Sequence, residues 1–417
     1  MAYRRHRFVQ LRKAAGYTQE RFAELLGVER STVVRWECAE TQPQPWLWPK
    51  ISQALGVSRE EFTDILDQVV ASPRRRASPP AQVPSRTPGT ELPLTLDGLR
   101  AALTSYRPFG ARAVAGGQPL AAVEARTVAL HNAYQQAEYR RLANMLPQLL
   151  GEVEDVVANT PEKQRRRAFR AQASAYVLAS KLASKAGDGE LAWLTADRAA
   201  VAARSAEAPE LAAVAAYQVG CAFMKASDKC AEAETLVVTT AEDLGRADDR
   251  DLDLLSIRGA LLLLAVLIAA RRGRPQDAKR YLAGAALLAG RLGRDGNRMW
   301  TAFGPTNVLI HEISAAVALG QLDKADTIGS TLDTSRLPAT LIGRRTQVHL
   351  DLATACARRP SGDPNAVLHL LEAERLAPEV FQVNAAARAL LTELISRERR
   401  HVTPGLRPLA ARAGVVR

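Results

Sequence analysis

Apolar residues between positions 8 and 66 recur at helical spacing in five short segments separated by turn residues. Residues 18–37 read TQERFAELLGVERSTVVRWE and contain the second and third of these segments. A helix does not continue through Gly27 at low cost, so we expect the chain to turn there. Ala23, four residues earlier, would let the third helix pack closely across the second. The pattern predicts two crossed helices joined by a tight turn.

The third predicted helix has two chemically different faces. At 100° per residue, Val33 and Trp36 lie on one side, which we expect to be packed. The opposite arc carries Arg30, Ser31, Val34 and Arg35. Arginine can pair bidentately with guanine, serine can bond to either base class, and valine can contact a thymine methyl group. This face predicts direct readout of bases in the DNA major groove, and the alternative is that the arginines are only solvated charges.

Residues 8–66 resemble the phage-repressor-like (XRE-type) DNA-binding domain, a unit of five helices. The second helix would begin after Thr18 as N-cap, the third would follow Glu29, and Ser58 would cap the fifth. The apolar residues assigned to the first, fourth and fifth helices are Phe8, Leu11, Ala15, Leu47, Ile51, Leu55, Phe62, Ile65 and Leu66.

The resemblance implies roles for individual residues. It makes Gln19 a phosphate or base contact, and Arg30, Ser31 and Arg35 the base readers. It pairs Arg12 with Glu37, a link between the first and third helices. The family usually ends the third helix with a glycine, whereas residues 38–40 here are Cys-Ala-Glu, so contacts of the following loop are not carried over.

The five tryptophans are interpreted mainly as packing residues. Trp36 is expected in the core of this small domain. Trp46 and Trp48 are expected to cover that core, with a partner-binding role as the alternative. Trp193 and Trp300 are expected to be packing anchors further along the chain.

Residues 71–91 change composition to ASPRRRASPPAQVPSRTPGTE, with five prolines and no apolar period. Proline blocks helices, and so few apolar residues cannot offset the entropy of ordering. The segment predicts a tether between a head, residues 1–70, and a C-terminal domain, residues 92–417. Its arginines, residues 74–76, would either contact the DNA backbone or be solvated.

The C-terminal domain is alanine- and leucine-rich, with helical spacing, short turns and no strand pattern. An alanine follows a turn at successive intervals of 49, 39, 47, 47 and 41 residues, at Ala143, Ala192, Ala231, Ala278, Ala325 and Ala366. This recurrence predicts stacked helical hairpins. It resembles tetratricopeptide (TPR) repeats over roughly residues 119–397, although the intervals exceed the usual period of about 34 residues and the Trp, Gly and Tyr signature is mostly missing. Residues 94–106 would form a leading helix, and the tail after His401 would be frayed.

A solenoid of this kind has a concave surface lined by the first helix of each hairpin. The residues there that are unusual for an alanine-leucine solenoid are Tyr217, Cys221, Met224, Phe303, Asn307 and His311. Asn307 could bond both the donor and the acceptor of a peptide backbone. These six residues are candidates for binding a peptide or small-molecule signal, and for Asn307 and His311 the alternative is a polar pair within the stack.

The chain has 56 Lys+Arg against 44 Asp+Glu, a formal net charge of +12 and a pI near 9.9. Such a charge attracts nucleic acid without proving it. The four cysteines lack zinc-site or disulfide spacing, which predicts a reducing cytoplasm. Residues 260–270 form an apolar run of 11 residues, about half a bilayer span, so we expect a buried helix and no membrane insertion. The N-terminus shows no signal-peptide pattern.

The P-loop, HExxH and GxSxG patterns are absent, so no enzyme activity, cofactor or metal is expected. The sequence therefore predicts an all-α protein, with a five-helix XRE-type head and an α-solenoid of TPR-like hairpins. Its expected function is that of a cytoplasmic, sequence-specific transcriptional regulator. The resemblance implies a homodimer on a double-stranded DNA operator, with repeats that sense a ligand or mediate dimerisation. The alternative is a TPR-type protein-interaction scaffold with weak or vestigial DNA binding.

Overall fold

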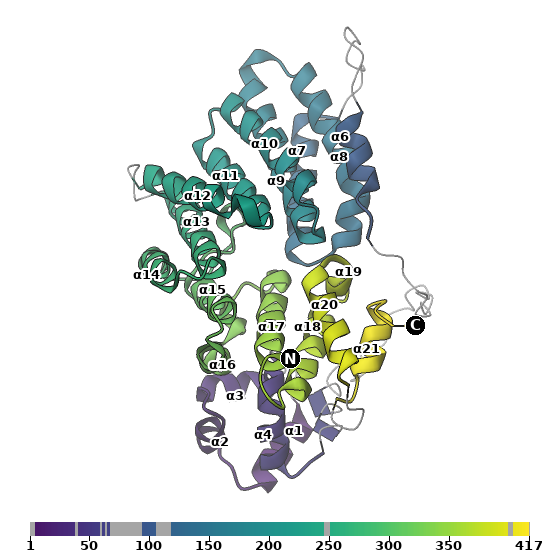
Figure 1. Cartoon of the computed structure of the whole chain (residues 1–417), viewed down its shortest axis with the longest axis vertical. Coiled ribbons are helices and arrows are strands. Elements are labelled where there is room, and N and C mark those ends of the chain that lie inside the picture. Colours follow the sequence, from purple (N-terminus) through teal and green to yellow (C-terminus); the bar gives the residue numbers. More distant parts are fainter. Residues whose placement is uncertain are drawn as a thin grey trace.

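The computed structural model describes residues 5–37, 41–58, 61–62, 65–66, 94–105, 118–245, 251–398 and 403–416. Every regular element in these ranges is a helix, which confirms the all-α fold. Figure 1 shows the head at one end of the molecule, against the last hairpins of the C-terminal domain. The predicted tether at residues 71–91 and the end of the third helix at residues 38–40 lie outside the described residues.

The head forms the helices that its turn residues predict. Its elements are α1 (His6–Ala14), α2 (Gln19–Leu26), α3 (Arg30–Glu37), the short 3-10 helix η1 (Pro45–Leu47) and α4 (Trp48–Leu55). The Thr18 side chain accepts a hydrogen bond from the Arg21 amide, and Gly27 ends α2 in the left-handed conformation at φ 73°. Ser58 and Glu61 cap each other's backbone amides at 3.1 and 3.0 Å, which confirms Ser58 as a cap.

The predicted apolar positions of the head form a core of their own. Its buried members include Phe8, Phe22, Val33, Trp36, Ile51 and Phe62. Trp48 covers this core as predicted, with its ring edge-on to Phe62 and its indole nitrogen donating to the Pro43 carbonyl. The assignment of Ala15 to the first helix was wrong by one residue, because Ala15 is the C-cap of α1. Helix α1 ends at Ala14, and Ala15 is exposed.

The C-terminal domain begins with α6 (Asp97–Thr104), which lies within the predicted leading segment. Hairpins follow, formed by α7 (Leu120–Gln135) with α8 (Tyr139–Asn159), α9 (Glu162–Ala186) with α10 (Gly189–Ser205), α11 (Pro209–Phe223) with α12 (Cys230–Leu244), α13 (Leu252–Arg271) with α14 (Pro275–Leu292), α15 (Pro305–Ala318) with α16 (Leu322–Thr331), and α17 (Ile342–Ala357) with α18 (Asp363–Leu376). Each first helix contacts the first helix of the next hairpin, from α7 through α17. The hairpins therefore form one continuous stack (Figure 1).

The alanines of the repeat pattern all fall near the start of a second helix. Four are buried, at Ala192, Ala278, Ala325 and Ala366, and Ala143 is partly buried. The sixth assignment was wrong, because Ala231 is exposed. The buried stripe of α12 runs through Ala233, Val237 and Ala241 at intervals of four, two residues out of register with the turn.

The stack curves until its ends meet. Helix α17 contacts α7, and the short helix α19 (Val380–Val383) contacts α9. The Arg140 amide donates to Glu379 at 2.8 Å, and the Arg140 side chain donates to Gln382 at 2.7 Å. Helix α20 (Ala385–Ser396) follows and contacts α17. The C-terminal domain is thus closed around its concave side.

Three further expectations concern single elements. The expected frayed tail was wrong, because α21 (Leu406–Arg412) packs Leu406 and Leu409 into the core. The apolar run 260–270 lies in α13, the one helix of the described residues that is long and apolar enough to cross a membrane, and 67% of its most apolar window is buried inside the protein. The expected packing role of Trp193 was wrong, because its side chain is 48% exposed.

Candidate nucleic-acid interface

A chain of side-chain contacts fixes the relative position of the first three helices. Arg12 Nε donates to Glu37 Oε1 at 2.6 Å, and the two side chains are only 5% and 6% exposed. The predicted pair between α1 and α3 is therefore confirmed. Gln19 Nε2 donates to the other Glu37 oxygen at 2.6 Å, and Arg30 Nη2 donates to Gln19 Oε1 at 3.3 Å. Gln19, predicted to contact DNA, is held at the start of α2 by residues of α3.

The two faces of α3 are divided as the sequence predicts. Val33 and Trp36 are buried in the head core. Arg30 and Ser31 are exposed, and Val34 and Arg35 are partly exposed. Arg30 pairs with Glu20 at 2.5 Å, an exposed contact that a stronger partner can replace. The face assigned to base readout is therefore outside the head core, and its contacts with DNA stay a prediction.

Arg35 is bound by the C-terminal domain. Its Nη1 donates to Ser335 Oγ at 2.6 Å, and its Nη2 pairs with Asp333 Oδ2 at 3.0 Å. Both partners belong to the 3-10 helix η4 (Thr334–Arg336) and its N-cap, which connect α16 to α17. The second Asp333 oxygen accepts the Ser335 amide at 3.0 Å and its hydroxyl at 2.6 Å. The acceptor oxygens are thus held in place before Arg35 reaches them.

A second contact lies beside the first. The Trp46 ring lies 5.0 Å from the His369 ring and 6.0 Å from the His349 ring, between centroids. Gln44 Nε2 donates to Thr334 Oγ1 at 3.2 Å. Trp46 packs partly against the head core, as predicted, and partly against the core of the last hairpins. The surface that Trp46 contacts outside the head belongs to the C-terminal domain of the same chain.

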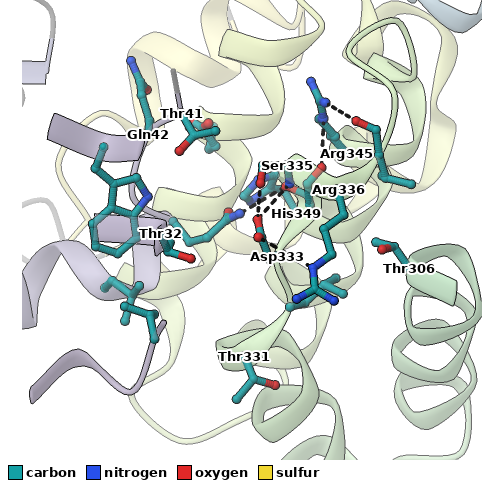
Figure 2. Close-up of a pocket in the computed structure, with 18 of the residues that line it drawn as sticks. Thr32, Thr41, Gln42, Thr306, Thr331, Asp333, Ser335, Arg336, Arg345 and His349 are labelled. Carbon is teal, nitrogen blue, oxygen red and sulfur yellow. Dashed lines mark hydrogen bonds and ion pairs between the residues drawn. The ribbon is translucent and has the colours of Figure 1, made fainter. Parts of the chain in front are cut away.

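A cavity of about 900 Å³ separates the remaining surfaces of the head and the last hairpins. Figure 2 shows Thr32 and Gln42 of the head on one side, and Asp333, Ser335 and Arg345 on the other. Hydrogen-bond distances at Arg35 leave no room for a DNA strand between α3 and η4. The major groove therefore cannot reach Arg35 in this arrangement.

The two histidines under Trp46 are uncharged. Burial lowers the pKa of His369 to about 3. Burial and the neighbouring His369 hold the pKa of His349 well below its usual value. Their Nδ1 atoms lie 3.3 Å apart, so one ring donates a hydrogen bond to the other.

Residues 9–62 match the helix-turn-helix family model. The head is a helix-turn-helix DNA-binding domain. This places the chain among DNA-binding regulators in general, and the helices of the match are those that carry the Arg12–Glu37 pair and the exposed face of α3. Searches against curated proteins and against solved structures gave no match.

The predicted ligand residues of the C-terminal domain lie in three different places. Tyr217 and Cys221 line a cavity of about 570 Å³ on the concave side. Burial raises the pKa of Cys221 to about 11, so this thiol is protonated. Met224 is partly buried at the end of α11 and does not line that cavity.

The other three predicted ligand residues are on or before α15. Phe303 is 1% exposed and its ring packs against Gly259, where a side chain would leave it no space. His311 Nδ1 lies 2.8 Å from the Asn307 carbonyl, and both side chains are buried in the stack. Asn307 and His311 therefore form a polar pair within the stack, which was the alternative interpretation of these two residues. Neither they nor Phe303 line the concave cavity.

The concave cavity also contains residues that the sequence analysis did not select. Lys181, Lys185 and Arg344 line it together with Trp300, whose ring stacks on His131 at 3.7 Å. Trp300 is thus a packing residue, as predicted. From the sequence alone, a lysine on a solenoid helix is usually interpreted as a solvated charge. Only the fold shows which lysines line the cavity and which are exposed.

Proposed function

We propose that this chain is a sequence-specific transcriptional regulator in which the C-terminal domain controls access to the recognition helix. The observation that carries the proposal is the double use of Arg35. The sequence assigns it to base readout, and the structure pairs it with Asp333 and Ser335. A guanidinium held by a carboxylate and a hydroxyl cannot at the same time bond to guanine.

The proposal involves two states of the head. In the docked state Arg35 and Trp46 contact the last hairpins. In the released state α3 enters the major groove. A signal that binds better to one state shifts the balance by its difference in affinity for the two. The TPR-like repeats would sense this signal, a small molecule or a peptide.

The same domain would bring two heads together. Helix-turn-helix heads commonly bind two half-sites about 34 Å apart, related by the two-fold axis of a dimer. A homodimer held by the repeats would raise the effective concentration of the second head at its half-site of a double-stranded operator. We place this regulator in the cytoplasm and assign it no enzyme activity.

The rival function is a protein-interaction scaffold with weak or vestigial DNA binding. The retained Arg12–Glu37–Gln19 contacts and the exposed Arg30 and Ser31 favour the regulator. The buried ion pair by itself would only stabilise the head, so this preference depends on the exposed arginine and serine of α3.

The test is selection of genomic DNA fragments by the purified full-length chain, read by sequencing and repeated with Asp333→Ala. We expect one enriched motif, arranged as two half-sites and recovered in higher yield by the variant. The recovered motif and a scrambled version are then compared at low and high salt, because only specific contacts keep their preference when phosphate contacts weaken. Enrichment of no motif by either protein would favour the scaffold.

A further inference from the structure

A cavity of about 570 Å³ lies on the concave side of the stack, and its wall is rich in cationic side chains. The wall comes from the first helices α7, α9, α11, α13 and α17, with η3 (Arg298–Trp300) and the start of α20. The cationic side chains that line it are Lys181, Lys185, Lys225, Arg271 and Arg344. Among the described residues of the wall, Asp351 is the one carboxylate. The cavity therefore carries an excess of positive charge.

Three of these cations, Lys181, Lys185 and Arg344, form no ion pair with a carboxylate of the described residues. Lys181 Nζ donates to the Trp300 carbonyl at 3.1 Å and lies about 6 Å from the Tyr134 and Trp300 rings. Lys185 Nζ lies 6.0 Å from the Tyr139 ring. In the described part of the chain, no carboxylate oxygen lies within 4.0 Å of a side-chain nitrogen of Lys181, Lys185 or Arg344. Burying such charges is unfavourable unless an anion accompanies them.

The titration of these lysines agrees with that geometry. Burial and the charge of Arg344 lower the pKa of Lys181 to about 7, and the same two causes lower the pKa of Lys185 to about 8. Burial raises the pKa of Asp351 to about 6, and Ser314 and Gln347 donate hydrogen bonds to it. Asp351 thus receives its hydrogen bonds from neutral donors, and the charges of Lys185 and Arg271 act on it without a direct ion pair.

The rest of the wall is aromatic. Tyr134, Tyr217 and Trp300 line the same cavity as Lys181 and Arg344. Cavities of about 300–1,000 Å³ with aromatic walls and a few convergent polar groups are typical of small-molecule sites. The contacts of α17 with α7 and of α19 with α9 bring the two ends of the stack together around this site.

We propose that this cavity binds a small organic anion, with its acidic group between Lys181 and Arg344 and its apolar or aromatic body against Tyr217 and Trp300. The acidic group is a carboxylate, a phosphate or a sulfonate, since each accepts hydrogen bonds from guanidinium and ammonium groups. The proposal names the chemical class of the signal, and its regulatory part rests on the function proposed above.

Helix α17 connects the cavity with the docked head. Arg344 faces the cavity, and its neighbour Arg345 donates to the carbonyls of Thr334 and Leu337 at 3.3 and 2.9 Å. Those bonds hold η4, whose Asp333 and Ser335 bind Arg35. An anion that draws Arg344 inward displaces α17, and the displacement reaches the acceptors of Arg35 through Arg345. This gives the bound anion different affinities for the docked and released states.

The test uses two probes that share one aromatic body. 8-Anilinonaphthalene-1-sulfonate carries a sulfonate, and N-phenyl-1-naphthylamine is its uncharged counterpart. Fluorescence titrations of the full-length chain are compared with those of Lys181→Met, Arg344→Gln and, as a control, Lys279→Met on the exposed face of α14. Near-ultraviolet circular dichroism confirms that each variant has retained its fold, because loosely packed chains also bind the anionic probe.

We expect saturable binding of one sulfonate probe per chain. Lys181→Met and Arg344→Gln should weaken it at least tenfold, while Lys279→Met and the binding of the uncharged probe change less than twofold. Equal loss of both probes, or an unchanged affinity for the sulfonate, would overturn the anion site. If one variant does not fold, Lys185→Met takes its place with the same expectation.

A second measurement separates this site from its regulatory role. The affinity of the full-length chain for the selected operator is measured with and without a saturating amount of the sulfonate probe. A change of threefold or more that disappears in Arg344→Gln supports the connection through α17. Probe binding with no change in DNA affinity overturns that connection. Failure of the probe to bind leaves the DNA selection experiment, and with it the proposed regulator, unaffected.

Discussion

Arg35 of α3 and Asp333 of the C-terminal domain form an ion pair of 3.0 Å between residues 298 positions apart in the chain. The two side chains are partly exposed, so the contact is of moderate strength and can be exchanged. It joins a residue that the sequence assigns to base readout to the connection between α16 and α17. Docking of the head on the C-terminal domain and readout of bases by Arg35 therefore exclude each other, because both need the same guanidinium group.

Removing the acceptor should favour DNA binding. A partly exposed ion pair is worth about 0.2–1 kcal/mol, so Asp333→Ala should raise the affinity of the full chain for its operator roughly two- to fivefold. Ser335→Ala in addition should increase the gain. Asp323→Ala is the control, because Asp323 lies on α16 and pairs with Arg359 instead. Fluorescence anisotropy with labelled operator measures the effect, and an unchanged affinity in both Asp333 variants would show that docking does not restrain the head.

Arg30 offers a cleaner test of base readout than Arg35, because its partners Glu20 and Gln19 lie within the head. Arg30→Ala should cost about 1–3 kcal/mol at the operator and leave affinity for scrambled DNA nearly intact. Lys13→Ala, at the exposed end of α1, should change both affinities by the same small factor. Competition binding against both duplexes decides this. A parallel loss in Arg30→Ala would make Arg30 a phosphate contact.

The Arg12–Glu37 pair should dominate the stability of the head. Glu37→Ala leaves Arg12 charged and buried, and it removes the partner of Gln19. Loss of one member of a buried pair typically costs about 3–5 kcal/mol. Hydrogen exchange should show faster opening of α1, α2 and α3, with the C-terminal hairpins unchanged. Glu24→Ala, an exposed carboxylate on α2, is the control and should exchange as the natural chain does.

Acid should weaken the packing around Trp46. The pKa of His369 in the folded chain is about 3, below the ordinary value of about 6.5, so the unfolded chain binds the proton first as pH falls. The contribution of His369 to the free energy of unfolding is fully present above about pH 6.5. Below that pH it decreases by about 1.4 kcal/mol per pH unit. His369→Leu should therefore reduce the loss of thermal stability between about pH 7 and about pH 5.5. An identical loss in the variant would mean that His369 is already charged in the folded chain.

The head could be predicted because its signals are local. Gly27, the Thr18 cap and the alternation of Val33 with Arg35 act within a few residues, and their geometry follows from backbone sterics and helical period. The repeats could be predicted for a similar reason. A small residue after each turn is needed wherever two helices of a hairpin approach, although Ala231 shows that this position can move by two residues.

The long-range contacts could not be predicted in this way. Asp333 and Ser335 read as an ordinary turn and helix cap, and their oxygens do act locally as caps. Nothing near them in sequence indicates that Arg35 would arrive from the head. The curvature that brings α17 to α7 is the sum of small rotations between hairpins, so it determines which lysines point inward without leaving a motif.

The isolated head tests which of two effects of the C-terminal domain is larger. Residues 1–70 include a hydrophobic core separate from those of the repeats, so we expect this fragment to fold. If dimerisation through the repeats dominates, the fragment should bind the operator much more weakly than the full chain, because the second head is no longer held nearby. If docking dominates, it should bind more tightly, since Arg35 is free. We expect the first result for the natural chain, and a still larger difference between fragment and full chain with Asp333→Ala.

Sedimentation of residues 92–417 supplies the remaining observation. A monomeric repeat fragment, combined with a head that binds as tightly as the full chain, would contradict control by dimerisation. Because docking at Arg35 predicts tighter binding by the isolated head, the same result would contradict control by docking as well.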